Sequence, residues 1–103
     1  MAHQPFGGPV VIKATATPLH TLLGLADTTF GPLVIRAETT AKGQAGRIYV
    51  GTSTAVTAAG ANAVGYLDPG EWLSLDQLGN THTNALFLVG TLNDKAYVLG
   101  ITY

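Results

Sequence analysis

Apolar and polar side chains alternate with a two-residue period along several short stretches of the chain. This is the pattern of a β-strand with one buried face, and it contrasts with the 3.6-residue period of an amphipathic helix. Together with two apolar runs and the C-terminal stretch, these segments predict strands at residues 9–17, 32–39, 47–51, 71–76, 86–89 and 96–103. In the last of them Tyr97, Leu99, Ile101 and Tyr103 share one face, which predicts that the C-terminus is tied into a sheet.

Residues 19–23 are the most ambiguous part of this pattern. Leu19, Leu22 and Leu23 have helical spacing, but Gly24 interrupts it and threonines flank it. We expect a short strand at residues 19–23 and a loop at residues 26–31. Seven or eight short strands without a convincing helix predict an all-β, antiparallel β-sandwich of the jelly-roll kind, with a small barrel as the alternative.

The sharpest turn lies at Asp68-Pro69-Gly70-Glu71. Proline presets φ at the second turn position and glycine supplies the positive φ at the third, so the four residues predict a type II turn. Asn93-Asp94 predicts a hairpin turn. The remaining connections are polar or small-residue loops at residues 40–46, 52–63 and 77–85.

The first nine residues are rich in glycine and proline. They predict an N-terminal arm at residues 1–9, followed by a single β-sandwich domain at residues 10–103, since 103 residues form one domain of common size. Phe6 is the only large apolar side chain between Met1 and Pro9. The arm is either a frayed end or a segment that lies on a neighbouring protein, with Phe6 as its plug.

The chain carries few charges. Charged residues make up 11% of it, against about 25% in ordinary domains, so little opposes association and we expect partners to cover much of the surface. The five basic residues do not cluster, which argues against nucleic acid as a partner. No apolar run is long enough to span a membrane, and the first residues lack the pattern of a signal peptide, which predicts a protein that folds where it is made.

Residues that could carry chemistry are scattered. His3, His20 and His82 show no metal-ligand spacing, and cysteine is absent. No Gly-x-Ser-x-Gly elbow or nucleotide-binding glycine motif occurs. Glu71 and Asp76 would point to opposite faces of one strand, so they do not form an acid/base pair. We therefore predict no catalytic residue, no cofactor and no metal site, and expect that the protein is not an enzyme.

Trp72 is the most informative single side chain. If Leu73 faces the core, Trp72 points outward, and an exposed tryptophan on a sheet is an interface candidate because it offers a large contact area at low entropic cost. Two alternatives stay open. The strand is buried on both faces, or Trp72 covers the edge of the sandwich within its own subunit.

One stretch resembles a known family. It contains a predicted strand that ends in a glycine, a serine two residues after that glycine, and a Leu-x-Pro-Gly-Glu turn. The positions are Ile48, Tyr49, Val50 and Gly51 for the strand, Ser53 for the serine, and Leu67, Pro69, Gly70 and Glu71 for the turn. The pattern is similar to that of small virion structural proteins of tailed bacteriophages, and it covers residues 47–76 best. The resemblance implies a β-sandwich or jelly roll that serves as a capsid decoration protein, a head fibre or another surface subunit.

Composition and resemblance together give two hypotheses. The first is a non-enzymatic virion structural protein, a capsid decoration or cement subunit that is made in the host cytoplasm, binds the outside of the assembled shell and stabilises it. Its partners would be the major capsid protein or other virion proteins and further copies of itself, with a trimer favoured. Its contact elements would be the N-terminal arm and the loops at residues 41–45, 52–63 and 77–85. The second is a carbohydrate- or receptor-binding module on a head fibre, spike or tail that uses Trp72, Tyr49, Tyr66 or His82.

Overall fold

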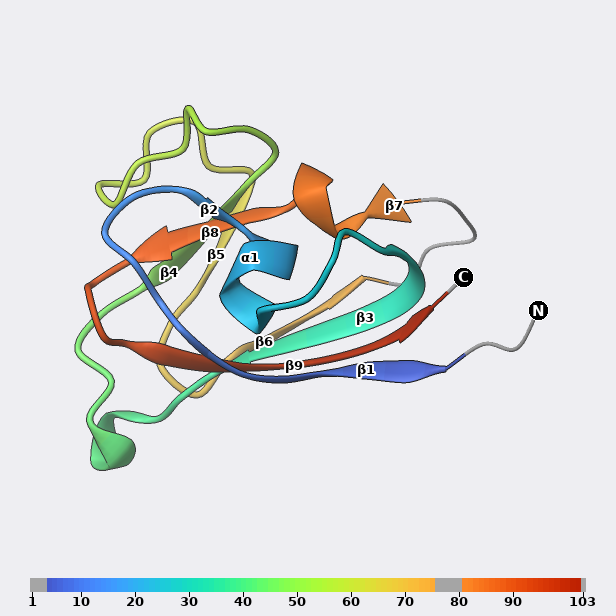
Figure 1. Cartoon of the computed structure of the whole chain (residues 1–103). Coiled ribbons are helices and arrows are strands. Elements are labelled where there is room, and N and C mark those ends of the chain that lie inside the picture. Colours follow the sequence, from blue (N-terminus) through green and yellow to red (C-terminus); the bar gives the residue numbers. More distant parts are fainter. Residues whose placement is uncertain (1–3, 76–80, 103) are drawn as a thin grey trace.

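A computed structural model describes residues 4–75 and 81–102 of the chain. The fold is a sandwich of two antiparallel sheets, as predicted (Figure 1). One sheet has five strands: β1 (Pro5–Val11), β9 (Lys95–Thr102), β3 (Thr29–Ala37) and β6 (Trp72–Leu75) in that order, with β7 (Thr81–His82) paired to one end of β3. The other has four: β2 (Thr17–Pro18), β8 (Phe87–Gly90), β4 (Ile48–Gly51) and β5 (Gly65–Leu67).

The strand pairings are nested along the chain. β1 pairs with β9, β2 with β8, β3 with β6 and β4 with β5. A chain folded double and then rolled gives this order, in which the first strand meets the last and the innermost pair lies next to its own turn. This is the topology of a jelly roll, so the prediction of a jelly-roll-like sandwich is confirmed.

The core lies between the two sheets. Alternate side chains of β3 and β4 point into it, and Phe30, Ile35 and Ile48 are fully buried there. Each such side chain contributes roughly 1.5–3 kcal/mol to the stability of the fold relative to an exposed position. The strands predicted at residues 47–51, 71–76 and 86–89 are all present, with ends shifted by at most two residues within the described part.

The strand predicted at residues 19–23 is wrong, because this segment is a helical turn, α1 (Leu19–Leu23). The helical spacing was the correct signal, and Leu19 is fully buried against the core. Gly24 ends the helix and does not interrupt it. It adopts the left-handed conformation with φ of 71°, and its N–H donates to the Thr21 carbonyl at 3.1 Å.

Residues 5–9 are not an arm. They begin β1, which pairs with β9 over its whole length from Pro5 opposite Ile101 to Val11 opposite Lys95. Phe6 lies opposite Gly100 and packs against the core of its own chain, because a glycine at that position leaves room for the ring. The strand predicted to reach residue 17 leaves the sheet after Val11, and β3 begins at Thr29, inside the segment expected to be a loop.

The predicted turns have the expected geometry. Gly70 has a φ of 83°, and the Glu71 N–H donates to the Asp68 carbonyl at 2.9 Å. Asn93 has a φ of 73° in the turn between β8 and β9. The connector after β3 contains a short 3-10 turn, η1 (Thr40–Lys42), and a second one, η2 (Thr83–Ala85), precedes β8. Residues 77–80 of the third predicted loop lie outside the described residues.

Candidate functional site

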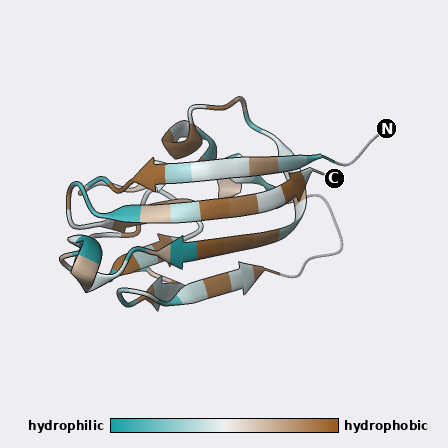
Figure 2. Cartoon of the chain, turned by 90° about the horizontal axis from the view of Figure 1, so that it is seen from below, coloured by the Kyte–Doolittle hydropathy of each residue, from teal (hydrophilic) through white to brown (hydrophobic). Residues whose placement is uncertain are grey.

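The outer face of the five-stranded sheet is uncovered by the described part of the chain, and we call it the open face. Its side chains come from four neighbouring strands, which Figure 2 shows side by side. The open face consists of Pro9, Val11, Val34, Arg36, Glu38, Trp72, Ser74, Lys95, Tyr97, Leu99 and Ile101. Nine large apolar side chains are exposed in the described part of the chain, and five of them, Val11, Trp72, Tyr97, Leu99 and Ile101, lie here.

The strand register arranges these side chains in rows across the sheet, because directly paired residues share a face. In one row Pro9, Tyr97, Arg36 and Trp72 follow one another across β1, β9, β3 and β6. The next row holds Gly7, Leu99, Val34 and Ser74. At the end of the sheet Val11 pairs with Lys95, whose carbonyl accepts the Glu38 N–H at 3.0 Å.

Trp72 is 72% exposed on this face, and Leu73 and Leu75 pack against the core on the other side of the strand. Leu73 thus faces the core, and Trp72 points outward, as the alternation of the strand predicted. The strand is not buried on both faces, and the indole is not among the described side chains that pack against the core. Of the five interface residues considered from the sequence, Trp72 is the one on the open face.

Glu38 and Tyr97 form the main polar contact of the open face. The Tyr97 hydroxyl donates to Glu38 Oε2 at 2.6 Å, and the Thr39 N–H donates to Glu38 Oε1 at 2.9 Å. These hydrogen bonds, the one from Tyr97 above all, hold the pKa of the Glu38 carboxyl below its usual range. The same contact raises the pKa of the Tyr97 hydroxyl. Arg36 forms no ion pair with any described residue.

The outer face of the four-stranded sheet is covered instead. The loop at residues 52–63 folds over it, and Thr57 forms a β-bridge with Thr15 of the connection before β2. Val56 and Val89 are buried although neither belongs to the central core cluster, which places a small second cluster under this loop. The segment at residues 52–63 is a loop, as predicted, and it packs on the sheet through Val56.

Tyr49 and Tyr66 lie together on this covered side. Their ring centroids are 6.2 Å apart, and the Arg47 guanidinium lies 4.1 Å from the centre of the Tyr66 ring. Arg47 Nε also donates to Asp68 Oδ1 at 2.6 Å, and this ion pair raises the pKa of the guanidinium. Tyr49 is half-buried because Gly60 packs directly on its ring. Tyr66 is 52% exposed and is the open part of this cluster.

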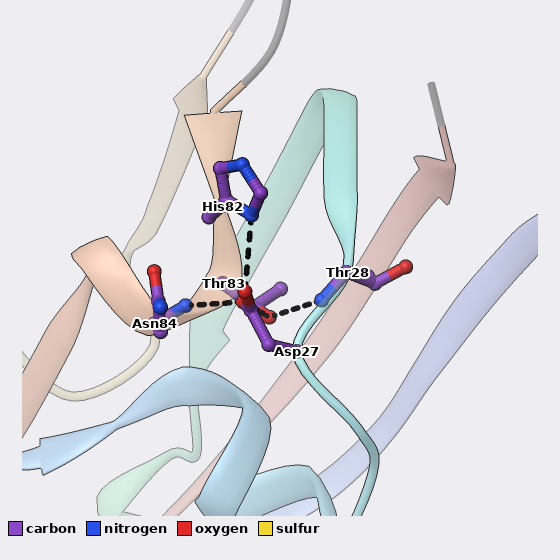
Figure 3. A network of polar contacts seen from close by, with 5 residues as sticks. All are labelled: Asp27, Thr28, His82, Thr83 and Asn84. Atoms are coloured by element: carbon purple, nitrogen blue, oxygen red, sulfur yellow. Dashed lines mark hydrogen bonds and ion pairs between the residues drawn. The ribbon is translucent and has the colours of Figure 1, made fainter.

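His82 belongs to a third location, the network shown in Figure 3. Its Nδ1 lies 3.0 Å from Asp27 Oδ2, while Asp27 Oδ1 accepts hydrogen bonds from the Thr83 hydroxyl at 3.0 Å and the Asn84 N–H at 2.9 Å. The Thr83 hydroxyl in turn accepts the Thr28 N–H at 3.0 Å. The network ties the loop before β3 to η2, which is an architectural role.

The charge state of Asp27 follows from these contacts. Partial removal from water works against its ionisation, but the hydrogen bonds that it accepts outweigh this effect and hold the pKa of the carboxyl below its ordinary value. In a hydrolytic triad the nucleophilic hydroxyl bonds to the imidazole. Here the Thr83 hydroxyl bonds to the carboxylate, so the geometry is not that of a triad.

An apolar cleft of about 450 Å³ opens between the sheets, at the edge where β5 and β6 lie. Phe30 and Val50 form its floor, and Leu73, Leu75 and Val64 line it. Among the described residues that line the cleft, Thr52 is the only one with a polar side chain, and none of them is titratable.

The described residues contain no group of three or more histidine or acidic side chains arranged to hold a metal ion. Likewise, no described helix has the length and apolar character needed to cross a bilayer. His3 and Asp76 lie outside the described residues.

Arg36, Tyr97, Leu99 and Ile101 were not considered as interface residues from the sequence. The signal was present in β9, where the outward residues are large while Ala96, Val98 and Gly100 on the other face are small. This alternation predicts a strand with an apolar outer face. No protein-family model, curated protein or solved structure matches this chain.

Proposed function

We propose that this chain is a non-enzymatic structural protein of a bacteriophage virion, a decoration or cement subunit on the outside of the assembled shell. The observation that carries the proposal is the open face. Tyr97, Leu99 and Ile101 present a contiguous apolar strip along β9, and Trp72 is exposed on β6 beyond Arg36, on a chain with only 11% charged residues. Contiguous exposed apolar surface marks a site of association, so a subunit that works inside an assembly is the best fit.

The fold is compatible with this role but does not select it. Jelly rolls serve as viral capsid domains and as lectins, and one fold supports many functions. The residues that carry the resemblance to phage virion proteins, Ile48 to Gly51 and the turn at Pro69-Gly70, form β4 and the connection into β6. They build the scaffold that positions Trp72 at the edge of the open face.

A cement subunit would act by linkage. It binds the assembled shell better than the free capsid protein, and its binding free energy adds to the stability of the shell. Many copies on a symmetric lattice make modest individual contacts sufficient. The open face would serve self-association, and the loop at residues 52–63 and the η1 turn, on other parts of the molecule, would contact the major capsid protein.

A carbohydrate- or receptor-binding module is the second candidate. The feature that favours it is the exposed Tyr66 ring with Arg47 at 4.1 Å. It ranks second because the proposed platform residues are dispersed. Trp72 and Tyr66 point away from the core on different sheets, Tyr49 is half-buried, and His82 is bonded to Asp27.

The test uses shells assembled without this protein. Purified chain is added, bound protein is quantified by co-sedimentation, and the temperature at which the shells release their contents is recorded. Binding to intact shells with a higher release temperature supports the proposal. A chain that leaves shells unbound, but binds a glycan on an array in a manner that Tyr66→Ala abolishes, would replace the proposal by the second candidate.

A further inference from the structure

The open face has the features of a surface that is complementary to itself. Four strands lie side by side in the order β1, β9, β3 and β6, three of them seven to nine residues long and β6 four residues long, so the midline of the face runs between β9 and β3. Rotation by 180° about an axis along this midline lays a second copy on the first with β1 over β6 and β9 over β3. The rows of side chains stay aligned in such a pair, and every contact occurs twice.

We propose that a second copy of this chain is the partner of the open face and packs on it about this two-fold axis. The inference deepens the proposed function and rests on its claim that the subunit self-associates. It assigns a specific surface to that association, and it yields a dimer in place of the trimer expected from the sequence.

Charge complementarity supports this partner and this axis. Lys95 on β9 and Glu38, which follows β3, lie in the same row at one end of the face. The rotation places Lys95 of each copy over Glu38 of the other, which gives two equivalent ion pairs across the interface. An axis perpendicular to the strands would place Lys95 over the opposite end of β9, where the described outward side chain is the apolar Ile101, so the described charges favour the axis along the strands.

The next row is complementary in a different way. The rotation places Arg36 over Tyr97 of the second copy, where the guanidinium can stack on the ring. Arg36 has no ion-pair partner among the described residues of its own chain, so it is available for this contact. Trp72 at one edge of the row meets Pro9 at the other edge, an aromatic ring on a flat apolar one.

The third row combines large and small side chains. Leu99 on β9 meets Val34 on β3, and these are the two apolar residues next to the axis. At the edges of the row Gly7 meets Ser74. The side chains are therefore small at the edges and larger at the centre. The interface thus has Leu99 and Val34 next to the axis, Arg36 stacked on an aromatic ring and the ion pairs of Lys95 and Glu38 at one end.

The face is large enough for a weak dimer. Three strands at a spacing of about 4.8 Å and a length of about 27 Å, together with the four residues of β6, give roughly 450 Å² per copy. Two copies bury roughly 900 Å², an area typical of a weak interface. The prolines of β1 fit this mode of association, because Pro5 and Pro9 lack an N–H and make that edge a poor template for strand addition.

The decisive experiment exchanges charges between two variants. In a dimer of Lys95→Glu the new glutamate of each copy lies against Glu38 of the other, and in a dimer of Glu38→Lys the new lysine of each copy lies against Lys95 of the other. Each variant should dimerise about ten-fold more weakly than the unchanged chain, since two rim ion pairs become repulsive. An equimolar mixture should recover the original affinity, because each copy then supplies the charge that the other lacks. Sedimentation equilibrium over a concentration series measures all four samples.

Two controls keep folding apart from association. Lys13→Glu reverses a charge away from the face, next to β8, and should leave the dimer unchanged. Leu99→Asp should give a folded monomer, since Leu99 is 61% exposed, whereas Val64→Asp, at a residue that is 68% exposed beside β5, should stay dimeric. Circular dichroism melting verifies the fold of each variant.

The possible outcomes separate this inference from the proposed function. A monomer at all concentrations, a trimer, or a mixture that stays as weak as its components overturns the two-fold packing on the open face. An unchanged chain that binds shells as a monomer overturns only the dimer. A dimer that complements by charge exchange but ignores shells supports the interface and overturns the role on the capsid.

Discussion

Replacement of Trp72 by alanine separates what the open face does for folding from what it does for association. The indole is 72% exposed in the single chain, and its strand neighbours Leu73 and Leu75 make the core contacts. The free energy of unfolding should therefore change by no more than about 0.5 kcal/mol, as for a surface residue without buried partners. Any large effect of the substitution has to appear in association.

The expected loss of association follows from the exposed area. A tryptophan presents about 250 Å², so the exposed fraction corresponds to about 180 Å². Full burial of this area would contribute about 4.5 kcal/mol at about 25 cal/mol per Å². At the edge of an interface about half of it is covered, which leaves about 2 kcal/mol for each copy. A two-fold dimer loses this amount twice, so its dissociation constant should rise about 1,000-fold.

Sedimentation equilibrium of the unchanged chain and of Trp72→Ala measures this difference, and urea unfolding followed by circular dichroism measures stability. Tyr66→Ala is the matched control, since Tyr66 is 52% exposed on the other sheet and should not weaken the dimer. The reasoning is refuted if Trp72→Ala associates as tightly as the unchanged chain. It is equally refuted if the variant loses several kcal/mol of folding stability, because Trp72 would then be part of the core.

Three further predictions concern the scaffold. Asp94 is 3% exposed and accepts the N–H groups of Ala45 at 2.9 Å and Gly46 at 3.0 Å, so Asp94→Ala should lower the free energy of unfolding in urea by about 2 kcal/mol, and Asp94→Asn by about half as much. A loss below about 0.5 kcal/mol for the alanine variant would show that water replaces the carboxylate. Gly100→Ala should cost about 1–3 kcal/mol, because a Cβ there would lie 2.6 Å from the Phe6 ring and 2.7 Å from Leu33, whereas Gly65→Ala meets no atom within 4 Å and should cost much less in the same assay. Equal losses would contradict the packing of Phe6. The pKa of Glu38 is lowered from 4.5, so the stabilisation by its contact with Tyr97 is present above pH 4.5 and is lost as the pH falls through the lowered value. The pKa of Tyr97 is raised from 10.0, so the same contact is lost again as the pH rises through the raised value. Tyr97→Phe should make the free energy of unfolding less dependent on pH in both the acid and the alkaline range. An unchanged pH dependence would show that other groups cause it.

The local structure of this chain could be predicted where period and turn chemistry agree. The alternation in β3 and β6 and the turn at Asp68-Pro69-Gly70-Glu71 each specify their conformation through side-chain direction and backbone φ. The same signals fixed the outward direction of Trp72. Short-range physics is sufficient for these features because all the groups involved lie within a few residues of one another.

The failures concern glycine and proline, whose structural role the linear pattern leaves open. Gly7 and Pro9 look like a flexible arm, yet Gly7 lies so close to the backbone of Val98 that only glycine fits there. Gly24 looks like a break in a helix, yet it is the cap that ends α1. The contact of Gly7 is tertiary and could not be read from the pattern, whereas the cap at Gly24 is a local hydrogen bond to Thr21 and was misinterpreted.

The candidate site depended on long-range pairing even more strongly. Trp72, Arg36, Tyr97 and Pro9 form one row only because β1, β9, β3 and β6 meet in this order. The sequence separation between Pro9 and Tyr97 offers no sign of their proximity. Trp72 was therefore recognised as a single interface residue, while the surface to which it belongs required the sheet.

The central claim is that the open face is buried in the working assembly, and the emission of Trp72 tests it most directly. Trp72 is the only tryptophan of the chain, so its fluorescence reports on this face alone. The account predicts water-exposed, red emission in dilute solution and a shift to the blue as copies associate, retained when shells bind the protein. Red emission at every concentration and on the assembled particle would contradict the account, because the face would then remain in water.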